Sequence, residues 1–324
     1  MSEAVPRNIR PAFPIGVARE DVRSKFQEIL GIDEIPTDLD FDLGTSWEED
    51  GLKFTQIKYP SYTNEIIDAT VAVPLDLQGA RLPGVVGMPG TGSSSEEVLH
   101  RTLYRPKPKR GPLLGWGREL AKKNYAVLSF SPKGCVSRRR TIGNWEEETK
   151  LLAPYGRTQL GMLADEALRA SLALRAMDIV DRSKIGFTGM SLGGLASWMA
   201  MSLVPWIKTS AAVCGVLGTM EQMIHYGNTK RHSSAIYIPQ LLRYFDHPQI
   251  VASCIAPRPF MMIAPTEDDD MPKAGVDELI HVVRPVYEKS GQSDRFLVHR
   301  PPGIHTYRLK YFDWVVDWFD AFLR

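Results

Sequence analysis

Short apolar runs alternate with helix-like segments through the second half of the chain, and this alternation limits the fold more than any other feature. Residues 160–177 carry apolar side chains at helical spacing, as at Leu163 and Ala167. The run IGFT at 185–188 follows and is typical of a buried strand. Strands separated by helices form parallel sheets that are covered on both faces, so the pattern predicts a mostly parallel α/β sheet with helices on both sides.

The apolar runs predict an eight-stranded sheet. The first runs follow one another without helices between them, so the sheet is expected to begin antiparallel. A closing helix is expected near residues 312–322, where aromatic and aliphatic residues recur at helical spacing. The eight predicted strands are residues 52–59, 65–73, 82–88, 125–130, 185–188, 210–216, 259–264 and 296–299.

The ends and spacings of these runs predict the domain organisation. Residues 19–30 form an amphipathic pattern that ends at Gly31, whereas residues 33–50 are acidic and rich in turn formers. We therefore expect residues 1–50 to form an N-terminal helical extension and residues 51–324 to form one main domain. Residues 217–257 separate two strands by far more than an ordinary connection, which predicts a small, lid-like helical insertion before the penultimate strand.

Composition excludes several classes of partner. Lys and Arg total 39 against 38 acidic residues, so no net charge draws the chain to nucleic acid or to an anionic membrane. The N-terminal stretch has no apolar core of signal-peptide length, and no apolar run is long enough to span a bilayer. The three cysteines lack metal-ligand spacing and are expected to be reduced thiols. These features predict a cytoplasmic protein, and they leave formation of a homo-oligomer open.

Residues 189–193 read GMSLG, which fits the pattern Gly-x-Ser-x-Gly between a predicted strand and a predicted helix. Flanking glycines permit a sharp turn that raises the Ser191 hydroxyl above the sheet. The same turn places the Leu192 N–H at a helix N-terminus, where it can stabilise an oxyanion. The alternative is a glycine-rich strand–helix turn with an incidental serine. The context favours Ser191 as a nucleophile with an oxyanion hole beside it.

A serine hydroxyl needs a neighbouring base at neutral pH. Of the seven histidines, His305 lies in a turn between the last predicted strand and the last helix, which places it at the carboxyl edge of the sheet. A carboxylate must then orient the imidazole. The acidic run after the penultimate strand supplies Asp268, the preferred choice, with Asp270 and then Asp269 as alternatives. Glu221 is a more remote candidate.

Other residues near this edge are candidates for contact with a ligand. Met88, Met190 and Met223 are predicted to line an adaptable apolar substrate site, although filling of the core explains methionines equally well. Two basic stretches, 105–110 and 138–140, are either attractors of an anionic substrate or solvated loops.

His225 and His232 stand seven residues apart without a supporting carboxylate pattern, so no metal site is expected.

Taken together, these motifs resemble the α/β-hydrolase superfamily. More narrowly, they are similar to its dienelactone hydrolase-like and acetyl xylan esterase-like serine esterases. The resemblance implies the α/β-hydrolase fold over roughly residues 50–324. It also implies a triad of Ser191, His305 and Asp268, because the family's Gly-x-x-Asp-x-x-x-Pro pattern, aligned on Pro272, places its aspartate there. The first oxyanion donor of the family corresponds to the backbone N–H of Thr91. The resemblance rests on MPGTG, GRELAKKNYAVLSF, GFTGMSLGG, IAPRPFMMIAPTEDDDMPKAGV and GIHTY.

The function expected from the sequence is hydrolysis of a small-molecule carboxylic ester through an acyl-enzyme, with no metal or organic cofactor. The same triad also serves peptide, amide, thioester and carbon–carbon bond hydrolysis, and the sequence does not separate these reactions. A ligand-binding homologue without catalysis is the alternative of another class.

Overall fold

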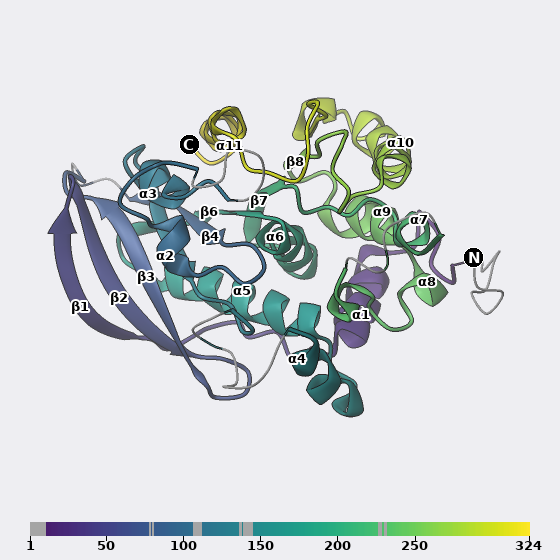
Figure 1. The fold of residues 1–324 in the computed structure, drawn as a ribbon, viewed down its shortest axis with the longest axis horizontal. Helices are drawn as coiled ribbons and strands as arrows, with labels where there is room; N and C mark the ends of the chain where they lie inside the picture. Colours follow the sequence, from purple (N-terminus) through teal and green to yellow (C-terminus); the bar gives the residue numbers. More distant parts are fainter. Residues whose placement is uncertain are drawn as a thin grey trace.

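The computed structural model describes residues 11–77, 79, 81–105, 112–135, 138, 145–225, 229 and 232–324. Within these residues nine strands form one sheet, in the order β1-β2-β3-β5-β4-β6-β7-β8-β9. Helices cover both faces of the sheet (Figure 1). The strands are β1 (Asp42–Glu49), β2 (Leu52–Pro60), β3 (Ile66–Pro74), β4 (Leu82–Met88), β5 (Ala126–Phe130), β6 (Val180–Met190), β7 (Ile207–Val213), β8 (Phe260–Ile263) and β9 (Phe296–His299).

The strand directions confirm the prediction of a mostly parallel sheet that begins with antiparallel strands. The pairs β1–β2, β2–β3 and β3–β5 are antiparallel. The pairs β5–β4, β4–β6, β6–β7, β7–β8 and β8–β9 are parallel. The parallel strands therefore end at one common edge, where the predicted nucleophile, base and acid follow β6, β9 and β8.

Strand β1 is the one strand of the sheet in the described residues that the sequence does not predict. It lies within residues 33–50, for which turns were expected, and it pairs with β2 from Asp42 opposite Lys58 to Glu49 opposite Leu52. Nearly all of its residues are exposed, because it is an edge strand with solvent on both faces. Apolar alternation arises only where one face is buried, so β1 carries no such pattern and was missed.

The helices form two layers on the sheet (Figure 1), with α3 and α11 on one face and α5 and α6 on the other. Packing along β4 agrees with this arrangement: a side chain at Gly84 would meet Leu174 of α5, and one at Gly87 would meet Trp116 of α3. The helices are α1 (Arg19–Leu30), α2 (Ser95–Val98), α3 (Trp116–Ala121), α4 (Trp145–Leu152), α5 (Gln159–Ala176), α6 (Leu192–Leu203), α7 (Met220–His225), α8 (Leu241–Tyr244), α9 (His247–Ile250), α10 (Lys273–Lys289) and α11 (Leu309–Phe322).

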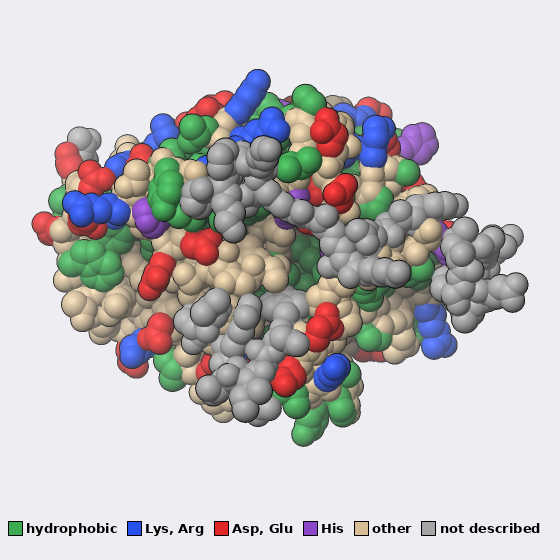
Figure 2. All heavy atoms as spheres, in the orientation of Figure 1, with side chains coloured by type: hydrophobic (Ala, Val, Ile, Leu, Met, Phe, Trp, Pro, Cys, Tyr) green, Lys and Arg blue, Asp and Glu red, His purple; other side chains and the backbone are tan. Residues whose placement is uncertain are grey.

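The connection between β7 and β8, for which a helical insertion was expected, contains α7, α8, α9 and the short 3-10 helix η3 (Ser234–Ile236). In the part of the chain that the structure describes, no helix combines the length and the apolar character needed to cross a bilayer. Side chains of both charges are scattered over the face shown in Figure 2, in keeping with the formal net charge of +1.

Helix α1 is held against the main domain by a close backbone approach to α5. The Thr158 hydroxyl, which caps α5, also donates to the Leu30 carbonyl oxygen at 2.8 Å. One turn further, a Cβ on Gly161 would lie 2.0 Å from that same carbonyl oxygen. Only glycine fits at this contact, because the atom it would meet is backbone and cannot rotate away.

Substitution Gly161→Ala tests this contact. Alanine normally stabilises a helix interior by about 1 kcal/mol relative to glycine. Here the forced separation of α1 and α5 should instead lower the free energy of unfolding by about 1–3 kcal/mol. Chemical denaturation measures the difference, and Ser24→Ala at an exposed position of α1 is the control, expected to change stability by about 0.5 kcal/mol or less. A stabilised Gly161→Ala variant would contradict the contact.

Candidate active site

Ser191 occupies the turn between β6 and α6 in a backbone conformation that few residues adopt. Its φ is 55° and its ψ is −117°, a region in which a non-glycine residue stores roughly 1–3 kcal/mol of strain. The turn is enforced from both sides: the Ser191 N–H donates to Val213 O at 2.8 Å, while a Cβ on Gly193 would lie 2.1 Å from Met88 O. The glycines of the Gly-x-Ser-x-Gly pattern therefore bring strand β4 and the start of α6 into contact.

Leu192 is the first residue of α6, and its N–H belongs to the first turn of the helix, where backbone donors have no partner within the helix. Thr91 follows β4 in the neighbouring glycine turn. Both residues line the cavity into which Ser191 opens. The two predicted oxyanion donors thus lie on elements that meet at Ser191.

His305 is bonded to Asp268. Its Nδ1 lies 2.8 Å from Oδ2 and 3.1 Å from Oδ1 of that carboxylate. The Asp268 side chain has no exposed surface, and that of His305 is 11% exposed. Because Nδ1 faces the carboxylate, the other ring nitrogen, Nε2, lies on the opposite side of the imidazole.

The neighbouring acids differ in their relation to His305. Asp270 Oδ2 lies 3.3 Å from Nδ1, and the Asp270 side chain is 16% exposed. Asp268 is closer, more buried and accepts the Asp270 N–H at 2.9 Å. The geometry favours Asp268 as the main partner of the imidazole and gives Asp270 a secondary contact.

Backbone hydrogen bonds bring the loops after β8 and β9 together. The Thr266 N–H donates to Pro301 O at 2.9 Å, and the Glu267 N–H donates to Gly303 O at 2.9 Å. These bonds extend the pairing of β8 and β9 beyond the ends of the strands. Asp268 and His305 therefore face each other as a consequence of strand register.

Ser191 and His305 line one cavity of about 420 Å³ at the carboxyl edge of the sheet. Met190 lines the same cavity, whereas Met88 and Met223 are fully buried core residues outside its lining. The substrate contact predicted for these two methionines is therefore replaced by a packing role. The described lining residues are Gly90, Thr91, Ser93, Pro112, Met190, Ser191, Leu192, Leu195, Cys214, Gly215, Leu217, His232, Ser233, Ile236, Asp270 and His305.

Cys214 is a residue of this site that the sequence analysis did not assign. It follows β7 directly, whereas the predicted strand 210–216 extends past it, so the sequence analysis did not place Cys214 at the end of a strand. Its thiol donates toward Thr306 O at 3.6 Å. Burial, reinforced by the Asp268 carboxylate, raises the pKa of this thiol well above its usual range. Cys214 is therefore a protonated, buried neighbour of the acid.

Cys214, Asp268 and His305 also offer three donor types that zinc accepts, with ligand atoms within 4.8 Å of one another. Two ligands of a tetrahedral zinc ion lie about 3.3 Å apart. The 2.8 Å between Nδ1 and Oδ2 is a hydrogen-bond distance instead. The arrangement fits an oriented imidazole better than a metal centre.

The two histidines for which no metal site was expected, and the two basic stretches, lie as follows. His232 Nε2 lies 3.0 Å from Asp270 O beside the Ser191 cavity, whereas His225 lines a different cavity. Arg138, from the second basic stretch, makes an ion pair with buried Glu166 at 2.8 Å and is therefore engaged inside the protein. Residues 106–110, 139 and 140 of the basic stretches lie outside the described residues.

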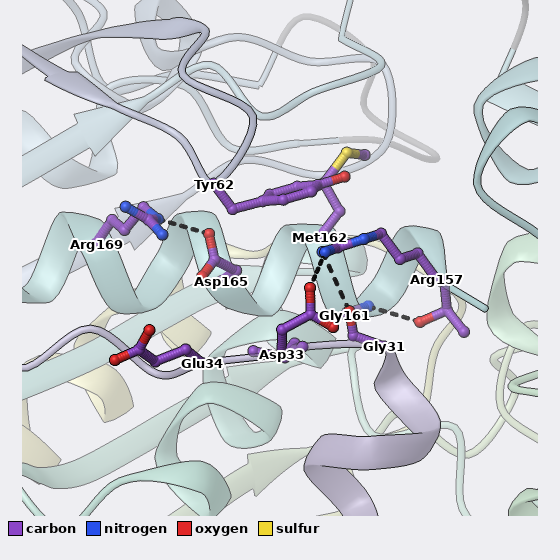
Figure 3. A pocket seen from close by; sticks show the side chains of 11 residues that line it. Gly31, Asp33, Glu34, Tyr62, Arg157, Gly161, Met162, Asp165 and Arg169 are labelled. Carbon is purple, nitrogen blue, oxygen red and sulfur yellow. Dashed lines mark hydrogen bonds and ion pairs between the residues drawn. The ribbon is translucent and has the colours of Figure 1, made fainter. Parts of the chain in front are cut away.

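Figure 3 shows a second, polar cavity of about 210 Å³ between the end of α1 and α5. Four of the charged side chains that line it form two ion pairs: Arg169 binds Asp165 at 2.7 Å, and Arg157 binds Asp33. None of the described residues that line this cavity lines the Ser191 cavity. The Ser191 cavity is the one that joins a serine to an oriented imidazole.

Several solved structures have this architecture. The chain is similar to a protein from Bacteroides fragilis NCTC 9343 described as a "putative acetyl xylan esterase", with a TM-score of 0.72, 18% identity and coverage of 91% and 79% of the two chains. It is similar to a glucuronoyl esterase from Solibacter usitatus (TM-score 0.68, 12% identity, coverage 94% and 91%). It is also similar to an acetyl xylan esterase from Paenibacillus sp. R4 (TM-score 0.65, 15% identity, coverage 98% of both chains).

These similarities and the strand order define the class: the chain has the α/β-hydrolase fold, which confirms the resemblance seen in the sequence at the level of the fold. In sequence, the chain is 31% identical over 188 residues to a Bacillus subtilis (strain 168) protein described as "Putative hydrolase YtaP". The match covers 58% of this chain and 61% of that protein. No protein-family model matches the chain.

The acid assignment is tested by Asp268→Asn and Asp270→Asn. Asparagine at position 268 stabilises the wrong imidazole tautomer, and the rate at which a fluorophosphonate labels Ser191 should fall by about 10⁴-fold. The rate should fall by less than about tenfold in Asp270→Asn, because the Asp268 bond remains. Stopped-flow or gel-based labelling measures both rates. The reverse order of the two variants would transfer the role to Asp270.

Proposed function

We propose that this protein hydrolyses carboxylic esters through an acyl-enzyme formed on Ser191. The observation that carries the proposal is the single cavity lined by a strained serine and by an imidazole whose Nδ1 is bound, at 2.8 Å, to a buried carboxylate. This combination activates a hydroxyl for nucleophilic attack.

In the acylation step, His305 Nε2 takes the proton of the Ser191 hydroxyl while Oγ attacks the ester carbonyl carbon. The N–H groups of Leu192 and Thr91 hold the resulting oxyanion, each such donor being worth roughly 100- to 1,000-fold in rate. Collapse of the tetrahedral intermediate breaks the bond to the alkoxide, which receives the proton from His305. Asp268 orients the imidazole and stabilises its protonated form.

In the deacylation step, a water molecule takes the place of the serine as the nucleophile. His305 takes one proton from the water, the hydroxide attacks the acyl carbon, and the proton returns to Ser191 Oγ as the acid leaves. The residues of this chain supply every proton transfer in the cycle.

The similarity to solved esterases and to a curated hydrolase supports a hydrolytic function in general. The strain at Ser191 supports the nucleophile in particular, because a costly backbone conformation persists only where the surrounding structure enforces it.

Replacement of the nucleophile tests the proposal. Ser191→Ala should abolish turnover of a soluble ester, a loss on the order of 10⁶-fold in kcat, because the acyl-enzyme cannot form. Release of product from an activated ester is the assay, and circular dichroism checks that the fold is retained. Ser93→Ala, which removes another hydroxyl that lines the same cavity, is the matched control and should keep most of the activity. Ester turnover by Ser191→Ala near the wild-type rate would overturn the proposal.

A further inference from the structure

The end of strand β7 lies between the other elements of the site. Val213 O accepts the Ser191 N–H at 2.8 Å. The next residue, Cys214, donates its own N–H to Ile263 O of β8 at 2.8 Å. A Cβ on Gly215 would lie 2.6 Å from Ser191 O, so the backbone passes directly beside the nucleophile. Three consecutive residues therefore join the turn of the serine to the strand that precedes the acid.

The Cys214 side chain extends this link to the base. Its Sγ lies 3.6 Å from the carbonyl oxygen of Thr306, the residue that follows His305, and the thiol donates to that oxygen. Sγ also lies within 4.8 Å of a carboxylate oxygen of Asp268 and of a ring nitrogen of His305. One sulfur atom therefore adjoins both the acid and the base, and it binds the backbone next to the base.

The surrounding structure enforces the conformation of Cys214. Its φ is 50°, in the left-handed region that residues other than glycine adopt rarely. The residue is 1% exposed, although it lines the same cavity as Ser191, whose φ is also positive. A costly backbone conformation persists only where its neighbours determine it, and such residues cluster at functional sites. The backbone of Cys214 thus shows the same sign of a built position as that of the nucleophile.

We propose that Cys214 is a positioning residue for the reaction at Ser191. Its thiol binds Thr306 O and thereby holds the loop of His305, and with it the imidazole, against Asp268. The inference rests on the proposed ester hydrolysis and adds to it a residue that takes no part in the proton transfers. A thiol is a weak donor, whereas a hydroxyl binds a neighbouring carboxylate strongly. Sulfur can therefore fill the space beside Asp268 and leave Oδ2 to the His305 ring.

Substitution Cys214→Ala tests the role, because it removes the thiol and keeps the backbone bond to Ile263 O. With Thr306 O released, the imidazole should lie less often in the position that accepts the serine proton. For 4-nitrophenyl acetate, kcat should fall by about tenfold or more. KM should change little, because the loss is felt in the transition state more than in substrate binding.

The pH profile separates this role from one in packing alone. Two carboxylates face the His305 ring, Asp268 at 2.8 Å and Asp270 at 3.3 Å, and their negative charges favour the imidazolium. The Cys214 thiol, whose pKa burial raises, stays neutral over this pH range. A looser loop weakens the pairing with the carboxylates, so the midpoint of the acid limb of kcat/KM should move to lower pH by about half a unit or more. Nuclear magnetic resonance titration of the His305 ring measures this midpoint without any ester.

Cys254→Ala is the matched control. Cys254 is as buried as Cys214, but its Sγ faces Arg19 O of α1 at 3.9 Å and it is not among the residues that line the Ser191 cavity. This variant should keep the wild-type kcat and the wild-type midpoint. If Cys214→Ala does not fold, Cys214→Ser replaces it. The serine hydroxyl would compete with the imidazole for the Asp268 carboxylate, so the midpoint should again move to lower pH.

The outcomes separate this inference from the proposed function. A wild-type kcat and an unchanged midpoint in the Cys214 variant overturn the positioning role, whatever stability is lost. Equal changes in Cys254→Ala would assign the effect to the loss of any buried thiol and would overturn it as well. Ester turnover that survives Ser191→Ala overturns the proposed function, and the resonance titration then still shows whether Cys214 holds the imidazole.

Discussion

The contact between strand β4 and the start of α6 is the constraint on which the site depends. Gly193 lies so close to Met88 O that a side chain there would clash at 2.1 Å. From the other side, the Ser191 N–H is bound to Val213 O of β7. The serine is thereby fixed between two neighbours of β6, and its strained φ of 55° follows from that position. In the proposed reaction, Ser191 attacks the ester from this fixed position.

The positions of residues that directly follow a strand can be predicted from the sequence. Ser191, Asp268 and His305 each follow an apolar run, and the carboxyl ends of parallel strands meet at one edge, so their proximity was inferable without coordinates. The choice of Asp268 among the consecutive acids came from the resemblance and not from the strand pattern, because it depends on the hydrogen bonds that the Thr266 and Glu267 N–H groups donate to the loop of His305. The pairing of backbone groups beyond the end of a strand cannot be predicted from the amino-acid composition of the loops.

The features that the sequence did not predict correctly also have causes in the local structure. Strand β1 is exposed on both faces, so backbone pairing alone defines it. Met88 and Met223 stand near the site in sequence, yet their side chains point into the core, and only Met190 reaches the cavity. Distance along the chain locates a residue at the edge of the sheet, whereas the direction of its side chain decides whether it meets a ligand.

Under the proposed function, the reacting groups and the residues that shape the cavity come from separate parts of the chain. The serine, the imidazole and the carboxylate follow strands whose pairing is shared across the whole sheet, so a change in their geometry would disturb the core. His232, Ser233 and Ile236 come from the connection between β7 and β8 and are joined to α4 through Glu146. A substitution there alters the wall of the cavity without altering the pairing of β6, β7 and β8. Under the proposed function, this division would let one hydrolytic frame accept different esters, because the sheet positions Ser191 and the insertion shapes part of the cavity wall.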